Sequence, residues 1–232
     1  FKMRFWNIGG EGQILMGALG SAVIITFMGG KYPDTATIIL SLVLSLAFGI
    51  VWAVIPALFK AKWNTNETLL TLMMNYISVC IVDYFIKSEA SSGTGTMSFD
   101  KGVVGPIGNN EFILKIILVA IVTIFMAVYL RYSKHGYEIS VVGDSQNTAR
   151  YAGMNVNKIV IRTMFISAGI AGLAGMFQVS GSATSHTLAD GIPGGGGFTG
   201  ITVAWLAKLN PIGIFVVSCL MGILQKGTAV AE

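Results

Sequence analysis

Long apolar runs recur along this chain, and they constrain its fold more strongly than any other feature. A helix needs about 20 apolar residues to cross the hydrocarbon core of a bilayer. The run from Ala36 to Phe59 has no charged residue and exceeds that length. Three more runs come close to it or exceed it: Thr68 to Ile86, Phe112 to Tyr132 and Ile159 to Gly181. The sequence therefore predicts an all-α fold, a polytopic bundle of transmembrane helices.

Two further apolar regions are shorter or interrupted. The run from Ile14 to Met28 follows a polar, glycine-rich string, residues 7–13, which indicates a broken helix. The run from Phe198 to Leu224 is divided near Asn210 and Pro211 into two parts, each short for a full crossing. Broken or re-entrant helices are therefore expected at both places.

Composition supports a membrane protein and excludes several other classes. The 232 residues are 53% hydrophobic and 11% charged, against about 25% charged in an average soluble domain. The 29 glycines have no fixed period, which excludes a fibrous protein and favours close helix packing in lipid. The net charge of +4 is small and scattered, so no nucleic-acid partner is expected. Cys80 and Cys219 lie inside apolar runs and are expected to be ordinary buried residues.

The placement of lysine and arginine predicts which loops face the cytoplasm. If residues 60–67 are cytoplasmic, alternating spans place residues 93–110 outside and residues 131–158 inside. Seven cationic residues then belong to the inside segments: Lys60, Lys62, Arg131, Lys134, Arg150, Lys158 and Arg162. Three belong to the outside segments: Lys31, Lys87 and Lys101. The excess inside supports this orientation.

A polar, turn-rich insert, residues 136–153, separates two of the long apolar runs. Asp144 is positioned to cap a short helix from Ser145 to Ala152. Gly153 then occupies the position after the helix where a positive φ is usual. The insert is therefore predicted to be an ordered cytoplasmic element.

Four apolar residues of the insert are predicted to form exposed knobs within a polar rim: Tyr137, Ile139, Val142 and Tyr151. Such a surface is typical of a docking element for another protein. The spacing alone equally allows a surface loop that only shortens the route between two spans.

The sequence contains no recognisable nucleotide-binding or catalytic motif. A P-loop needs GxxxxGK followed by Ser or Thr, and neither residues 169–175 nor residues 194–197 meet that pattern. His135 and His186 are predicted on opposite sides of the membrane, and no HExxH or acidic pair is present. An intramembrane enzyme is thus disfavoured, and any ATP that drives this protein must bind another chain.

Polar residues in apolar surroundings mark a candidate solute pathway, because they are costly in lipid and broken helices expose backbone groups. The candidates are Asn7, Glu11, Gln13 and Asn75. An interhelical hydrogen bond is the alternative for Asn75, and a membrane-interface position is the alternative for Glu11. Phe198 follows four glycines and is a candidate gate.

Small residues recur at four-residue spacing in one run: Ser167, Ala171 and Gly175, and also Ala168 and Gly172. They predict close packing against another helix, with a contact that slides during a transport cycle as the sharper alternative. Residues 88–110 are rich in Gly, Ser and Thr. They are expected to be mobile, or ordered only by an external partner.

Five motifs carry a resemblance to a known family. In chain order they are NIGGEGQILMGAL from Asn7, NETLLTLMMNYI from Asn66, GYEISVVGDSQNTARYAGMNV from Gly136, ISAGIAGLAGMFQVSG from Ile166 and GGGFTGITVAWLAKLNPIG from Gly195. Together they resemble the permease subunit of a bacterial ABC importer, in the branch with ribose and branched-chain amino-acid permeases. The similarity is greatest to nucleoside permeases. One departure lies at Trp205, Ala207 and Lys208, where relatives more often carry an aliphatic residue, glycine and a short polar turn.

The resemblance implies that residues 133–158 form a cytoplasmic coupling loop that sits in a groove of an ATPase subunit. The residues it assigns to coupling are Gly136, Tyr137, Glu138, Ile139, Val142, Gly143, Asp144, Asn147, Ala149, Arg150, Tyr151 and Gly153. It implies one transmembrane permease domain over residues 1–232, truncated at both ends, in a bacterial plasma membrane. No cofactor is expected on this chain, since ATP and Mg²⁺ belong to the ATPase subunit. The other implied partners are a second permease subunit, identical or related, and an extracellular substrate-binding protein.

The function predicted from the sequence is therefore inward transport of a small polar solute by alternating access. A nucleoside is the first choice, and a simple sugar or a branched-chain amino acid stays open. A passive channel is the remaining alternative, although it has no need of an ordered cytoplasmic insert.

Overall fold

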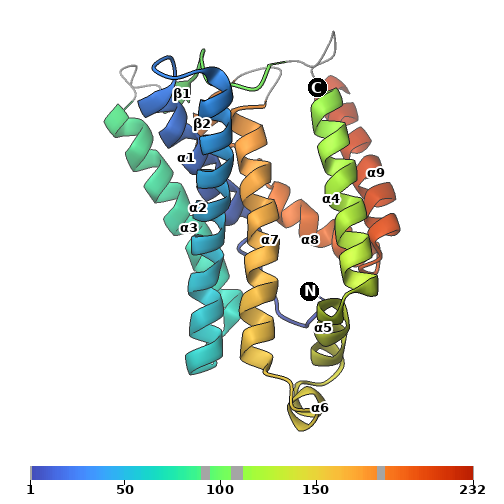
Figure 1. Ribbon diagram of the computed structural model, residues 1–232. Helices are drawn as coiled ribbons and strands as arrows, with labels where there is room; N and C mark the ends of the chain where they lie inside the picture. Colours follow the sequence, from blue (N-terminus) through green and yellow to red (C-terminus); the bar gives the residue numbers. More distant parts are fainter. Residues whose placement is uncertain (1, 90–94, 106–111, 182–185, 232) are drawn as a thin grey trace.

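The computed structural model describes residues 2–89, 95–105, 112–181 and 186–231, and it is almost entirely helical (Figure 1). In chain order the elements are α1 (Gly10–Met28), α2 (Asp34–Trp63), α3 (Glu67–Glu89), β1 (Thr96–Ser98), α4 (Ile113–Tyr132), α5 (Lys134–Asp144), α6 (Gln146–Tyr151), α7 (Val156–Val179), β2 (Thr187–Ala189), α8 (Gly196–Leu206) and α9 (Pro211–Ala231). Within these ranges five helices are long and apolar enough to cross a membrane: α1, α2, α3, α4 and α7. The predicted all-α bundle is confirmed.

The centre of the bundle is made by α1, α2 and α7, which pack backbone to backbone. A Cβ added at Gly49 on α2 would lie 2.8 Å from the carbonyl oxygen of Ala168 and 2.9 Å from the Cα of Gly172. A Cβ added at Gly17 on α1 would also collide with Gly172. Ser45 adds a hydrogen bond, donated by its hydroxyl to the carbonyl oxygen of Gly17 at 2.6 Å. The predicted close packing is confirmed for Ala168, Gly172 and Gly175. It is wrong for Ser167, which is exposed.

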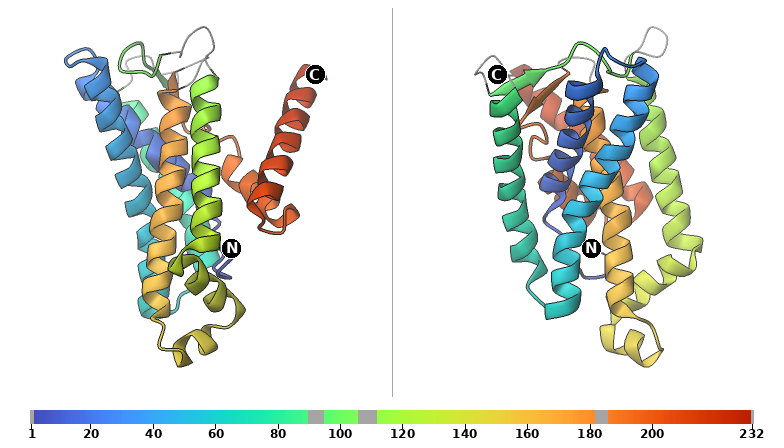
Figure 2. Two further views of the ribbon diagram at one scale, coloured as in Figure 1. Left: turned by 45° about the vertical axis from the view of Figure 1, so that its right-hand side comes forward. Right: turned by 60° about the vertical axis from the view of Figure 1, so that its left-hand side comes forward.

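One end of the molecule carries the α2–α3 turn together with α5 and α6, and the other end carries β1 and β2 (Figures 1 and 2). Residues 60–67 and 131–158 therefore lie at the same end of the molecule, as alternating spans require. We call the end with α5 and α6 the inner end and the opposite one the outer end.

The outer end is more ordered than the composition of residues 88–110 suggested. β1 and β2 pair antiparallel, with Thr96 opposite Ala189 and Ser98 opposite Thr187. Phe99 is buried, and the amide of Gly102 donates to the carboxylate of Asp34 at 3.1 Å. The expectation of mobility is wrong for residues 95–105, because the chain's own β2 orders them. Residues 90–94 and 106–110 of that prediction lie outside the described residues.

The interrupted C-terminal run divides as the sequence predicted. α8 ends at Leu206, the chain reverses through Lys208 (φ 49°) and Leu209 (φ 58°), and α9 begins at Pro211. With 11 residues, α8 is too short to cross a bilayer. It lies at mid-height in the molecule, and α9 runs from there to the outer end (Figure 1). The two cysteines are exposed on α3 and α9, which corrects their expected burial.

Candidate functional site

The insert folds into two short helices, α5 and α6, at the inner end. Ser133 caps α5 by accepting a hydrogen bond from the Gly136 amide at 3.0 Å. Ser145 caps α6 by accepting one from the Thr148 amide at 3.2 Å. Asp144 was the predicted cap, but it is the last residue of α5, and the hydroxyl that follows it takes the role. Gly153 has the expected positive φ, 75°.

One face of this unit is fixed to the bundle. Ile139 and Val142 of α5 and Ala149 of α6 are at most 3% exposed. They join a cluster that includes Met3 and Phe5 from the segment before α1, together with residues of α2 and α7. The prediction that Ile139 and Val142 form exposed knobs is wrong, because they anchor the unit instead. Gly136 and Gly143 are also buried, and a Cβ at Gly143 would collide with the carbonyl oxygen of Lys2.

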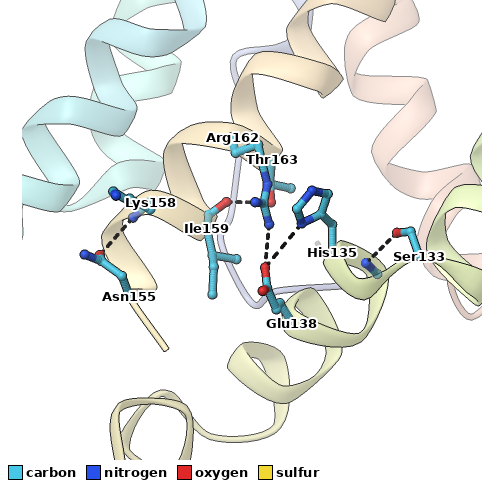
Figure 3. A network of polar contacts seen from close by, with 9 residues as sticks. Ser133, His135, Glu138, Asn155, Lys158, Ile159, Arg162 and Thr163 are labelled. Carbon is cyan, nitrogen blue, oxygen red and sulfur yellow. Dashed lines mark hydrogen bonds and ion pairs between the residues drawn. The ribbon is translucent and has the colours of Figure 1, made fainter. Parts of the chain in front are cut away.

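An ion pair adds a second link between this unit and the bundle. Arg162 on α7 donates to the carboxylate of Glu138 on α5 at 2.5 Å, and His135 lies 3.4 Å from the same carboxylate (Figure 3). The hydrogen bond from Arg162 holds the pKa of Glu138 below its usual range, against the opposing effect of burial, and His135 acts in the same direction. Glu138 therefore fixes α5 rather than presenting a charge to a partner.

The opposite face of the unit is open to solvent. The predicted coupling residues on this face are Tyr137, Asp144, Asn147, Arg150, Tyr151 and Gly153. Tyr151 is 93% exposed and Tyr137 65% exposed. Large tyrosines held on an anchored helix favour protein recognition, because little conformational freedom is lost on contact.

A polar cavity of about 230 Å³ lies beside α6, between it and the α2–α3 turn. Arg4, Lys60, Glu67 and Arg150 line it together with several amide side chains. Lys60 and Glu67 form an ion pair at 2.9 Å. Within the described residues, neither Arg4 nor Arg150 has an acidic partner at ion-pair distance. The cavity therefore offers positive charge to an incoming acidic group.

At mid-height, the first turns of α1 and α8 meet around the carboxylate of Glu11. The carboxylate accepts hydrogen bonds from the amide of Gly195 at 2.8 Å and from the amide of Gly197 at 2.7 Å. Gly195 and Gly194 have φ of 76° and 54°, the left-handed region that glycine adopts readily. Since a helix N-terminus carries a partial positive charge, the carboxylate stabilises the start of α8. Glu11 thus lies inside the molecule rather than at the membrane interface.

The other predicted pathway residues surround the start of α1. Asn75 on α3 accepts from the Gly12 amide at 2.9 Å and donates to the carbonyl oxygen of Ile8 at 3.0 Å. Asn7 and Gln13 exchange side-chain hydrogen bonds at 3.3 and 3.4 Å. Gln13 is 2% and Asn75 6% exposed, so both now satisfy polar groups of the protein. The bond from Gly12 to Asn75 joins α1 and α3, which is the interhelical hydrogen bond named above as the alternative to a pathway role.

Two cavities lie along α4 and α7, one toward the outer end and one toward the inner end. The outer one, of about 720 Å³, is lined by α4, α7 and residues 187–192, which lead to α8. The inner one, of about 330 Å³, is lined by the segment before α1, by α4, α5 and α7, and by Leu209 after α8. Asn7 lines the inner cavity, whereas Glu11, Gln13, Asn75 and Phe198 line neither of these two. Phe198 is on α8 and is 43% exposed.

Several residues of these sites were missed by sequence reasoning. Thr71 accepts from the Ile8 amide at 3.2 Å, and its position one helical turn before Asn75 was a usable signal. Trp6 and Trp205 stack with ring centroids 5.1 Å apart. No local signal predicts that contact, because the two rings are far apart in the chain.

Comparison with known proteins places the whole arrangement in one family. Residues 1–232 match the family described as branched-chain amino acid transport system / permease component. The chain belongs to this family. Together with the five long apolar helices found among the described residues, membership identifies a multi-pass protein of the plasma membrane.

Curated relatives within the family carry related transport names. The chain is 31% identical to the guanosine ABC transporter permease protein NupP of Bacillus subtilis, over 98% of this chain and 67% of the relative. It is 26% identical to the glucose ABC transporter permease protein TsgB13 of Haloferax volcanii, over 100% of this chain and 64% of the relative. For the nucleoside ABC transporter permease protein NupB of Lactococcus lactis the identity is 26%, over 97% and 65%.

The chain thus spans about two thirds of the length of these curated relatives. No solved structure matches it.

Proposed function

We propose that this chain is the membrane-spanning part of an ATP-driven importer that moves a small polar solute into the cell. The observation that carries the proposal is the α5–α6 unit, which is anchored on one face and exposed on the other. When a partner displaces a unit that is packed against the bundle, the bundle must move with it. A loosely attached loop can move without changing the bundle. Membership in a permease family supports the same conclusion.

The exposed face of α5–α6 is the proposed docking site for a cytoplasmic ABC ATPase subunit. Tyr137 and Tyr151 supply aromatic contact area, and the cavity with Arg4 and Arg150 receives an acidic side chain of that subunit. The chain has no P-loop of its own. ATP and Mg²⁺ therefore belong to the partner in this proposal, and no cofactor is assigned to this chain.

The proposed solute pathway uses the outer and the inner cavity, which both lie along α4 and α7. The outer cavity is large enough for a nucleoside-sized ligand, since ligand pockets commonly measure about 300–1,000 Å³. Residues 187–192 before α8 line the outer cavity and Leu209 after α8 lines the inner one, so α8 is proposed to control passage between them, with Phe198 as gate. Glu11, Gln13 and Asn75 act in this scheme by holding the broken helices in place.

The proposed solute is a nucleoside, by analogy with relatives named for guanosine and nucleosides. A glucose-type sugar is the second candidate, because a relative named for glucose matches the entire chain. An extracellular binding protein is the proposed source of solute at the outer end. A second permease subunit is the remaining proposed partner, and the exposed apolar surface of α4 is available to it.

Reconstitution of the full-length protein with an ATPase subunit and a binding protein in proteoliposomes tests the proposal. Uptake of radiolabelled guanosine, adenosine, glucose and leucine is measured with ATP and with a non-hydrolysable analogue. Uptake of a nucleoside that requires hydrolysis is expected, with unlabelled glucose failing to compete. Equal flux with and without hydrolysis would identify a passive facilitator, and sugar-selective uptake would replace the nucleoside.

A further inference from the structure

Residues 2–11, here called the connecting segment, run from the inner end of the molecule to its middle. At the inner end the segment is held by the α5–α6 unit. The carbonyl of Lys2 lies against Gly143 of α5. Met3 and Phe5 are 3% and 5% exposed, in the same cluster as Ile139 and Val142. A displacement of α5 therefore has to move the start of the segment or open a void beneath it.

Further along, the segment contacts the end of α8. Trp6 stacks on Trp205 with ring centroids 5.1 Å apart and an angle of 20° between the ring planes. Trp205 is in the last turn of α8, and each ring is about half exposed. Neither Trp6 nor Trp205 is among the predicted coupling or pathway residues.

At its far end the segment holds the beginning of α8. Glu11 accepts hydrogen bonds from the amides of Gly195 and Gly197. Ile8 is fixed to α3 by its amide, which donates to Thr71, and by its carbonyl oxygen, which accepts from Asn75. Both ends of α8 are therefore attached to one segment of ten residues, 2–11.

Besides the connecting segment and α7, the contacts offer one further route between α5–α6 and α8, through α4 and α9, which contact each other. The extensive contacts of α8 are with α1 and α9, and those of α5 are with α4, α6 and α7. α7 is closely packed against α1 and α2 through glycines and is poorly suited to independent movement. Residues 2–9 of the connecting segment are not helical, so they take no part in the glycine-mediated helix packing, although Glu11 belongs to the first turn of α1.

From these contacts we propose that the connecting segment transmits movement of the α5–α6 unit to α8, so that docking at the inner end opens or closes the route between the two cavities. Trp6 and Trp205 act as positioning residues that hold the C-terminal end of α8 to the segment. The inference rests on the proposed function, because it takes the ATPase subunit as the source of the movement.

Cysteine labelling on α8 tests the proposal in the complete importer. Cys80 and Cys219 are exposed and are first replaced by serine. Gly200→Cys then places a thiol on α8 at an exposed position with no heavy atom within 4 Å of the added Cβ. The rate of maleimide labelling is measured in the resting complex and in the complex trapped with ATP and vanadate. A several-fold difference between the two states is expected.

Trp205→Leu, Trp6→Leu and the double variant are then compared in this background. Each single variant is expected to abolish most of the difference in labelling while the ATPase subunit still co-purifies. The double variant is expected to be no worse than either single one, because the two rings act as a pair. Leu206→Ala, an exposed residue beside Trp205, is the matched control and retains the difference.

Gly143→Ala probes the opposite end of the segment, with Gly222→Ala as control, since a Cβ at Gly222 meets nothing within 4 Å. Gly143→Ala is expected to reduce the labelling difference and Gly222→Ala to preserve it. The inference is overturned if Trp205→Leu and Gly143→Ala keep the full difference in labelling rate between the two states. It is also overturned if the Gly200→Cys protein without these substitutions shows ATP-driven uptake but no change in labelling rate. A parent complex without ATP-dependent uptake overturns the proposed function itself.

Discussion

α7 and α4 flank the same α5–α6 unit, yet they are packed in opposite ways. α7 buries ten of its 24 residues, whereas within the described part of the chain α4 buries none of its 20. α4 is nevertheless the more apolar helix by sequence. Hydropathy therefore predicts which helices enter the bilayer, and small residues decide which of them pack in its centre. The α5–α6 unit consequently has one rigid side and one side that depends on lipid or another subunit.

The strongest way to break this comparison is to enlarge a residue at the glycine contacts. A Cβ at Gly172 would collide with the carbonyl oxygen of Ser45 on α2. Gly172→Leu is expected to destabilise the protein by about 3 kcal/mol or more, since overpacking costs about 1–3 kcal/mol even in cores that adapt. The exposed Ala120→Leu on α4 is the matched control. Thermal unfolding in detergent, followed by size-exclusion chromatography, compares them, and equal stability of the two would refute the contrast.

A second test removes atoms instead of adding them. Met176 on α7 is 1% exposed and Ile124 on α4 is 64% exposed. Met176→Ala is expected to cost about 2–5 kcal/mol, the range for buried aliphatic truncations, and Ile124→Ala about 0.5 kcal/mol or less. The same unfolding assay measures both. A large loss from Ile124→Ala would reveal that α4 is packed against a second subunit in the purified protein.

The ion pair of Glu138 with Arg162 sharpens the comparison, because it fastens α5 to the rigid side. The pKa of Glu138 is lowered from the ordinary value of 4.5, so the contribution of the ion pair to stability is complete above pH 4.5. It is lost as pH falls through the lower pKa of the folded state. The effect is expected to be about 1 kcal/mol or less, since the pair is partly exposed. Limited proteolysis of residues 133–158 should accelerate at low pH in the parent, and Glu138→Gln should be cleaved rapidly at neutral pH as well.

Much of the fold was predictable because lipid imposes a simple length rule. The runs that became α2, α3, α4 and α7 were identified from apolar length alone, and Pro211 marked the start of α9. The contacts around Glu11 were not predictable, because they join residues 184 and 186 positions apart. No local pattern shows that the starts of two broken helices meet.

The error on α5 has a different cause. Gly136, Ile139 and Gly143 recur at spacings of three and four, the period of a buried helical face. Ile139 and Val142 were nevertheless interpreted as exposed because the insert as a whole is polar. The tyrosines at 137 and 151 do lie on the open face. For the burial of α5 residues, the helical period is a more reliable signal than the average polarity of the insert.

The smallest effect on stability is expected for Tyr151→Ala, at about 0.5 kcal/mol or less, because the side chain is 93% exposed. Its effect on partner binding is expected to be large. Tyr84→Ala is the matched control, because Tyr84 is also exposed, at 77%, and lies near the outer end of α3.

Affinity of the ATPase subunit for these two variants in nanodiscs tests the central claim most directly. We expect at least tenfold weaker binding for Tyr151→Ala, about 1.4 kcal/mol, and unchanged binding for Tyr84→Ala. Unchanged binding for Tyr151→Ala, and for Arg150→Glu combined with it, would contradict the assignment of the exposed α5–α6 face as the docking site.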